Sequence, residues 1–431
     1  MQANSNANQN DVKVLRDLAK RYMEIAQTDV MPVRKKLWKD LHDLKPQRPV
    51  IIFEPFWLDG YLDDYKLQCE DTLLQNVEKR MMFAIRQFDE MDDDIVVEPY
   101  FRIAWWGPGL VSTGKEFGDI KIEEHTAKEA GLAYLSNFPI KTPDDIKRLT
   151  PRTFRIDRKP ALEMKDRLEN IFGDILPVKL GNFDNFDFDL GNQPFTGNNF
   201  IGVTWDLFKL IGTERIMTWV YDCPDALHAL CRFLTDDKTR FYNFLKGEKL
   251  LDFNTDNQLA GPSCYGYVSD LPAVGTDKEV ELKDLWTWPE SQETQSMSPK
   301  MFSEFFLPYI SELANMFGLS YYGCCERVDD KLDYVKKAIK NLRIVSVSHW
   351  NDFKKVGEEL GKDYVFSRKP TPAYVSGETA NWDLVEKEAI ETREATKNGC
   401  LEIICRDVYS SSCTPARAKE WVKMWKRIVG I

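Results

Sequence analysis

The sequence predicts an α/β protein, a (β/α)8 TIM-type barrel with an N-terminal helical extension and inserted loops over the barrel mouth. About nine short apolar runs alternate with helix-like segments along the 431 residues, which is the pattern of a parallel sheet with helical crossovers. Eight such runs complete a barrel, and the ninth is left for an inserted hairpin. An open doubly wound sheet is the alternative, but the sequence lacks the glycine-rich phosphate turn that normally marks one.

Residues 1–48 form the predicted extension. The first residues, Met1 to Asp11, are polar and rich in Asn and Gln, and we expect a short disordered tail there. Apolar residues then recur at helical spacing from Asp11 to Leu44. Pro46 and Pro49 end this region, so residues 49–431 are assigned to the barrel.

The predicted strands are short apolar or β-branched runs that close at polar or turn-forming residues. They are residues 50–53, 95–97, 175–181, 200–204, 250–254, 319–323, 343–348, 364–367 and 400–404. Helical periodicity is expected between them, at residues 71–91, 214–234, 301–317, 329–341, 352–360, 382–397 and 414–429.

Composition narrows the class of protein. The net charge is −11 and no block of Lys or Arg stands out, which argues against a nucleic-acid or anionic-membrane partner. No run of about 18 apolar residues predicts a transmembrane helix, and the start has no apolar signal-peptide core. We therefore expect a cytoplasmic protein with a small-molecule substrate. Nine cysteines in a chain of this length argue against a secreted disulfide framework.

Polar residues follow most of the predicted strands. In a barrel the carboxyl ends of the strands converge on one face, where active sites form. The set comprises Glu54, Glu98, Asn182, Asp184, Asn254, Asp256, Cys324, Cys325, Glu326, His349, Arg368, Lys369, Cys405, Arg406 and Asp407. Such residues are costly at the ends of buried strands unless they are paired or used in function.

Thiols suggest a metal site. With four histidines in the chain, a three-histidine centre is disfavoured, so a metal would depend on thiolates and carboxylates. Cys324 or Cys325, together with Cys405 and Glu326, could bind Zn²⁺ and leave one position open for substrate. Neighbouring cysteines on a strand point to opposite sides, so one of the pair is expected to face the mouth. The alternative is that these thiols are core residues.

Several strand-end side chains suggest substrate chemistry. Arg368 and Lys369 could hold a carboxylate or phosphate, or could pair with nearby carboxylates. Glu54 and Glu98 each precede a proline and could act as acid and base. His349 could be a metal ligand, a general base or a structural histidine.

Two loops could close over a small ligand at the barrel mouth. One contains Asn182 and Asp184 among phenylalanines, and the other contains Tyr267 among glycines. Core packing is the alternative for their aromatic residues. Trp350 follows His349 and is a further candidate for substrate binding.

Four segments resemble the uroporphyrinogen decarboxylase-like superfamily. They are Leu37 to Pro49, Gly323-Cys324-Cys325-Glu326, Ser346-Val347-Ser348 with Trp350, and Ser367-Arg368-Lys369-Pro370. The resemblance extends from about Leu37 to the C-terminus. It implies a (β/α)8 barrel, often a homodimer, in a superfamily that contains decarboxylases and zinc-dependent methyltransferases serving corrinoid proteins.

The two branches differ in their signatures. The decarboxylases carry arginines just after the first strand, where this chain has none between Phe53 and Gly60. The methyltransferases use a His-x-Cys pair and a late Cys, for which Cys324 or Cys325 and Cys405 are the matching positions. The histidine position reads Tyr322 or Gly323, so the resemblance leaves Glu326 or His349 to supply that ligand.

The leading hypothesis is a zinc-dependent methyltransferase, or a related enzyme that cleaves C–O or C–N bonds, acting on a small anionic substrate. A corrinoid carried by a partner protein, or a thiol, would accept the group. A metal-free lyase or decarboxylase using Glu54, Glu98 and His349 is the second hypothesis. A non-catalytic small-molecule sensor is the third.

Overall fold

A mostly parallel sheet of seven strands forms the centre of the molecule. The computed structural model describes residues 8–54, 61–62, 64–104, 110–112, 116–126, 134–181, 200–408 and 412–431. The strands run in the order β1 (Val50–Phe53), β17 (Cys400–Cys405), β16 (Val365–Arg368), β15 (Leu342–Val347), β14 (Leu319–Tyr322), β13 (Trp286–Pro289) and β10 (Phe200–Ile201). All neighbours in this sheet are parallel. The predicted α/β class is therefore confirmed.

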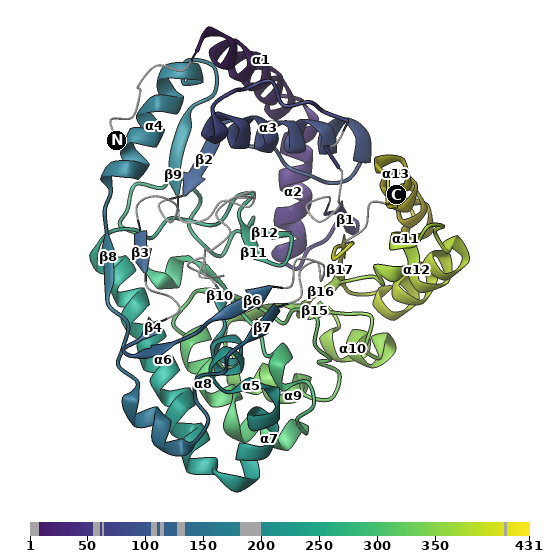
Figure 1. Ribbon diagram of the computed structural model, residues 1–431. Coiled ribbons are helices and arrows are strands. Elements are labelled where there is room, and N and C mark those ends of the chain that lie inside the picture. The colour runs from purple at the N-terminus through teal and green to yellow at the C-terminus, as the bar shows by residue number, and fades with distance from the viewer. Residues whose placement is uncertain are drawn as a thin grey trace.

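The closed eight-stranded barrel is not confirmed. In the described part of the chain, the sheet stays open between β1 and β10. A separate parallel pair consists of β2 (Phe101–Ala104) and β9 (Val178–Gly181). Figure 1 shows helices around the outside of the strands.

Two predicted strands are extended segments without a strand ladder, because side chains bind their backbone groups. The indole of Trp38 donates to Asp94 O at 3.0 Å, and Arg34 donates to Ile95 O at 2.9 Å, so residues 95–97 pair with no strand. Beside β13, the amide of Asn254 both donates to and accepts from the backbone of Trp286, at 3.1 and 2.9 Å. In both segments, side chains form the hydrogen bonds to backbone groups that a neighbouring strand would otherwise form.

The helices predicted at 71–91, 352–360, 382–397 and 414–429 begin and end within one residue of those limits. Residues 214–234 instead belong to two helices that meet at Cys223, and the helix at Lys159–Phe172 was not predicted. Asp71 and Thr414 act as N-caps, since their side chains accept from Leu74 N and Arg417 N. The helices are α1 (Gln9–Ala26), α2 (Val30–His42), α3 (Thr72–Met91), α4 (Lys159–Phe172), α5 (Val203–Asp222), α6 (Pro224–Gly247), α7 (Pro299–Phe305), α8 (Leu307–Ala314), α9 (Leu332–Ala338), α10 (Phe353–Leu360), α11 (Ala373–Ser376), α12 (Trp382–Thr396) and α13 (Pro415–Val429). Among the described helices, none is both long and apolar enough to cross a membrane.

Short strands complete the fold. They are β3 (Leu110–Ser112), β4 (Glu116–Phe117), β5 (Ile120–Lys121), β6 (Glu124–Thr126), β7 (Tyr134–Ser136), β8 (Phe154–Ile156), β11 (Leu259–Gly261) and β12 (Cys264–Tyr265). The last two form an antiparallel hairpin near the middle of Figure 1, between the N-terminal helices and the main sheet.

The two faces of the main sheet pack into two different hydrophobic cores. On β17, Cys400 and Ile404 belong to the hairpin-side core, which also contains Trp38 of α2 and Cys264 of the hairpin. Leu401, Ile403 and Cys405 belong to the α13-side core, which contains Trp421 and Trp425. Alternate residues of a strand point to opposite faces, so this division decides which strand-end residues can meet.

Candidate functional site

The Cys-Cys-Glu segment after β14 is held in place by hydrogen bonds. Gly323 has φ of 98°, which suits glycine, and its carbonyl accepts from the Trp288 indole at 2.8 Å. The Ser346 hydroxyl donates to Cys324 O at 2.7 Å. The carboxylate of Glu326 accepts from Cys324 N at 2.7 Å and from Ser291 N at 2.9 Å. Glu326 is therefore engaged in fixing the loop.

This loop presents two thiols. Cys325 is exposed and Cys324 is half-buried, with their Sγ atoms 3.7 Å apart. Cys325 Sγ lies 3.9 Å from Asp407 Oδ2, which follows β17. The hydrogen bond from Cys324 lowers the pKa of Cys325, while the same interaction and burial raise the pKa of Cys324 well above its usual range. Cys325 is therefore the thiol suited to react as a thiolate.

Arg406 lies beside the thiols, between two carboxylates. Its Nε is 3.6 Å from Glu54 Oε2 and 3.4 Å from Asp407 Oδ1. Within the described residues, Nε and Nη1 of Arg406 and Oε2 of Glu54 are buried without a hydrogen-bond partner. Burial alone would lower the pKa of Arg406, but the neighbouring carboxylates hold it well above its ordinary value. We call Glu54, Cys324, Cys325, Arg406 and Asp407 the rim cluster.

The rim cluster contains a group to which the sequence analysis gave no role. Arg406 was present among the strand-end residues, but the neighbouring Arg368 and Lys369 were assigned to the anion instead. The pairing of Arg406 with Glu54 could have been predicted from their positions. They follow β17 and β1, which are neighbours in the sheet. Glu54 also accepts from the hydroxyl of Ser263 in the hairpin turn.

The structure does not bring the four predicted zinc ligands together. Cys405 is fully buried in the α13-side core, where burial raises its pKa well above the usual range. On β17, the side chain of Cys405 points to the face opposite that of Glu402. The carboxylate of Glu326 is already bound to backbone N–H groups. Period-two alternation along β17 accounts for this correction.

A different set of possible metal ligands lies between α2, the hairpin and the main sheet. In the residues that the structure describes, one group of three or more His, Cys, Asp or Glu side chains could hold a metal, with its ligand atoms within 4.8 Å of one another. It consists of His42, Cys264 and Glu402, all fully buried. The sequence analysis missed it because its members lie 138 to 360 positions apart.

The two predicted substrate cations have other partners. Arg368 is fully buried and donates to Glu388 Oε1 at 2.6 Å and Val347 O at 3.0 Å, with its guanidinium 3.8 Å from the centre of the Phe353 ring. Burial lowers its pKa to about 10. Lys369 donates to Ser367 Oγ at 2.6 Å, and burial lowers its pKa to about 8. Neither side chain is arranged as an exposed anion clamp, and Arg368 follows the alternative prediction, since it pairs with a carboxylate.

Glu98 and Tyr267 contact each other. The Tyr267 hydroxyl donates to Glu98 Oε1, and Lys35 lies 2.6 Å from Glu98 Oε2. Both carboxylate oxygens of Glu98 are thus engaged, by Tyr267 and Lys35. Tyr267 is a buried residue of the hairpin-side core.

The remaining predicted site residues are dispersed. His349 is half-buried, and its ring centre is 4.2 Å from that of Trp350, a residue 61% exposed. Burial and the charge of Arg368 lower the pKa of His349, while Asp407 opposes them. Asn182 and Asp184 lie outside the described residues.

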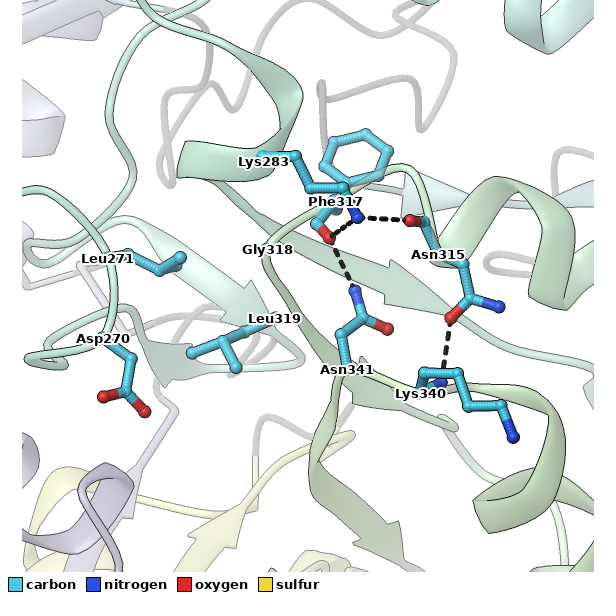
Figure 2. Close-up of a pocket in the computed structure, with 9 residues that line it drawn as sticks. All are labelled: Asp270, Leu271, Lys283, Asn315, Phe317, Gly318, Leu319, Lys340 and Asn341. Atoms are coloured by element: carbon cyan, nitrogen blue, oxygen red, sulfur yellow. Dashed lines mark hydrogen bonds between the residues drawn. The ribbon is translucent and has the colours of Figure 1, made fainter.

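A hollow of about 590 Å³ lies at the other end of the sheet (Figure 2). Gly318 and Leu319 at the start of β14 and Asn341 before β15 line it. Two of its polar side chains are engaged by the backbone, since Lys283 donates to Asn315 O at 2.7 Å and Asn341 donates to Phe317 O at 3.0 Å. In strand–helix folds, residues at the amino ends of the strands serve stability, and active sites form at the carboxyl ends. The rim cluster lies at the carboxyl ends, so it is the candidate site.

Comparisons with known proteins were made on both sequence and structure. No family model matches the chain, and no curated protein matches it. Among solved structures, a methyltransferase from Methanosarcina mazei is similar, with a TM-score of 0.48 and 12% sequence identity. The match covers 91% of this chain and 98% of that one.

Proposed function

We propose that the chain is an enzyme that binds a small anionic substrate at the rim cluster and transfers a methyl or similar small group from it. The observation that carries the proposal is Arg406, whose Nε and Nη1 are buried and without a hydrogen-bond partner in the described part of the chain. Leaving such donors unbound is costly. A carboxylate or phosphate of the substrate would accept a charge-assisted hydrogen bond from one of these donors.

The carboxylates beside Arg406 hold its guanidinium in position. Glu54 Oε2 and Asp407 Oδ1 lie at 3.6 and 3.4 Å from Arg406 Nε, so they fix the guanidinium without forming a good hydrogen bond to it. Glu54 is itself positioned by Ser263. An arriving anion would therefore meet a pre-oriented cation at the carboxyl ends of β1 and β17.

Cys325 supplies the nucleophile that the rim cluster itself offers. Its sulfur would donate an electron pair to the substrate carbon, and the C–O or C–N bond would break with its pair on the leaving atom. That atom would take a proton from water. The alternative acceptor is a corrinoid carried by a partner protein, in which case the methyl group would not remain on Cys325.

The test uses the purified full-length chain with methoxyacetate and its neutral analogue methoxyacetamide. Calorimetry should show binding of the anion alone, and Arg406→Gln should weaken it at least about tenfold, the loss expected for a charged hydrogen bond. Arg327→Gln is the matched control, since Arg327 is an exposed residue of the loop after β14 that carries Cys325, and it pairs with Asp329 at 2.7 Å. Equal binding by Arg406→Gln and the native chain would refute the anion site.

Group transfer is tested separately by mass spectrometry of the Cys325 peptide and by product analysis with an added corrinoid protein. Methylation of Cys325, or of the corrinoid, supports the proposal. A bound anion recovered unchanged under both conditions would identify a sensor instead.

A metal-free lyase or decarboxylase is the second candidate, favoured by the buried, unbonded Oε2 of Glu54. Glu54 would act as the base, with His349 as its partner acid. Release of carbon dioxide from the substrate with its methyl group retained would support this candidate against group transfer.

A further inference from the structure

We propose that His42, Cys264 and Glu402 bind a zinc ion between the N-terminal helices and the main sheet, at a centre separate from the rim cluster. His42 Nε2 lies 3.3 Å from Glu402 Oε2 and 3.6 Å from Cys264 Sγ, and the sulfur lies 3.3 Å from the same carboxylate oxygen. Zinc bonds of about 2.0 Å to N or O and about 2.3 Å to S place tetrahedral ligand atoms about 3.3–3.5 Å apart. The three side chains thus already have the spacing of a zinc site.

The orientation of the imidazole agrees with this assignment. His42 Nδ1 lies 2.9 Å from the carbonyl oxygen of Tyr267, which can only accept a hydrogen bond. Nδ1 therefore carries the proton, and the lone pair of a neutral ring is on Nε2, directed at Cys264 and Glu402. A backbone acceptor behind a ligating histidine is the usual arrangement in metal sites.

The three ligand side chains are buried, and one carboxylate oxygen among them has no hydrogen-bond partner in the described residues. All three ligand side chains are fully buried, and the rings of Trp38 and Trp286 pack 5.6 and 5.7 Å from that of His42. Within the described residues, Glu402 Oε1 has no hydrogen-bond partner. The buried charge of Lys369 acts on both Glu402 and Cys264. A divalent cation bound by the three side chains would compensate the remaining cost of burying a carboxylate and a thiolate.

The proposed ion would join three distant segments. His42 ends α2, Cys264 begins β12 and Glu402 lies within β17. The metal would therefore clamp the N-terminal helices and the hairpin onto β17 of the main sheet. Such a site contributes directly to folding stability, and the hairpin it holds also carries Ser263, the partner of Glu54.

The first experiment needs no variant. Zinc-loaded native protein is measured by metal analysis and by X-ray absorption. We expect one ion per chain with one sulfur and two or three N/O neighbours. Two sulfurs per zinc would place the ion on the Cys324–Cys325 pair and overturn the proposal, as would the absence of stoichiometric zinc.

The second experiment replaces zinc with Co²⁺, whose thiolate bond gives a charge-transfer absorption. Cys264→Ser should abolish that band, and Glu402→Gln should weaken Co²⁺ binding at least about tenfold. The matched controls are Cys325→Ser, at the rim, and Cys231→Ser, a fully buried thiol in the α13-side core. Retention of the band in Cys264→Ser, or its loss in Cys325→Ser, would also overturn the proposal.

Chelation tests the clamp without relying on a variant's folding. Removing the ion from the native chain should lower its thermal midpoint, and zinc should restore it, while anion binding at Arg406 is scored independently. An unchanged midpoint after complete removal of zinc would contradict the clamp. The proposed function is tested by methoxyacetate binding at the rim cluster, whereas the zinc centre is tested by metal content and thermal stability. Failure of one proposal is therefore distinguishable from failure of the other.

Discussion

Arg368 and Lys369 are adjacent in the chain but point to opposite sides of the end of β16. Arg368 faces α12, where it pairs with Glu388 at 2.6 Å and donates to Thr392 Oγ1 at 3.2 Å. Lys369 faces the other side, where it donates to Ser367 and lies 5.4 Å from the centre of the Tyr321 ring. Two cations that appear as one motif in the sequence therefore serve different parts of the molecule.

The first prediction concerns the buried pair of Arg368 and Glu388. Arg368→Met should lower the free energy of unfolding by about 3–5 kcal/mol, because it leaves Glu388 buried without its cation. The double variant Arg368→Met/Glu388→Gln should recover part of that loss. Urea denaturation of the native chain and the variants measures both.

Arg232→Met is the control for that experiment. Arg232 pairs with Glu312 at 2.8 Å, but both side chains are nearly half exposed, so its loss should cost less than about 1 kcal/mol. Equal losses for Arg368→Met and Arg232→Met would show that Arg368 has no special structural role.

The second prediction concerns thiol reactivity. Iodoacetamide near neutral pH should modify Cys325 faster than any other cysteine of the described residues, because it is exposed and its pKa is lowered. Cys324→Ala removes the hydrogen bond that lowers this pKa, so the pH–rate profile of Cys325 should shift to higher pH. Peptide mass spectrometry against time gives the rates.

Cys223 provides the internal reference, since it is a half-buried thiol far from the rim in sequence. An unchanged Cys325 profile in Cys324→Ala would mean that the two sulfurs do not interact in solution.

The sequence alone predicted the positions of the strands that are both apolar and bounded by turn-forming residues. Residues 50–53 form β1 with the predicted limits, and residues 400–404 form β17 with one residue added. It failed where a polar side chain replaces a strand, as Asn254 does beside β13. It also missed β13 itself, whose aromatic run Trp286-Thr287-Trp288 ending at Pro289 is a strand signal.

The site was predictable only in part, for a geometric reason. Strand ends identify Glu54, Cys325 and Arg406 as neighbours at one rim, but not which side each residue faces. For this reason Cys405 was predicted to lie at the rim, although its side chain points into the α13-side core. His42 and Glu402 contact each other across 360 positions, through the packing of α2 on the sheet, and no local pattern encodes that contact.

The third prediction concerns Gly323, which sets the thiol loop. Gly323→Ala should cost about 1–2 kcal/mol because φ is 98°, where an L side chain is strained. Its new Cβ would also lie 3.2 Å from Ser346 Cβ, so the loop should shift and Cys325 alkylation should change. Gly275→Ala is the matched control, with φ of 91° and no atom within 4 Å of the new Cβ. A Cys325 rate that is the same in both variants would contradict this role.

The last prediction concerns pH and Asp93, a fully buried carboxyl that accepts from Gln87 at 2.8 Å and from Phe53 N at 3.1 Å. Burial raises its pKa from 3.8 to about 6.

Between these pH values the folded chain retains a proton that the unfolded chain has released, so the Asp93 contribution to stability is full below pH 3.8 and falls as the pH rises through 6. At about 1.4 kcal/mol for each pH unit, this amounts to about 3 kcal/mol. Asp93→Asn cannot titrate, so its stability relative to the native chain should rise by up to that amount across the window, as measured by urea denaturation at several pH values. Asp64→Asn should show the opposite sign, and only below about pH 3.8, because Arg86 lowers the pKa of Asp64 from 3.8. Parallel pH curves for Asp93→Asn and the native chain would show that Asp93 does not titrate in this range.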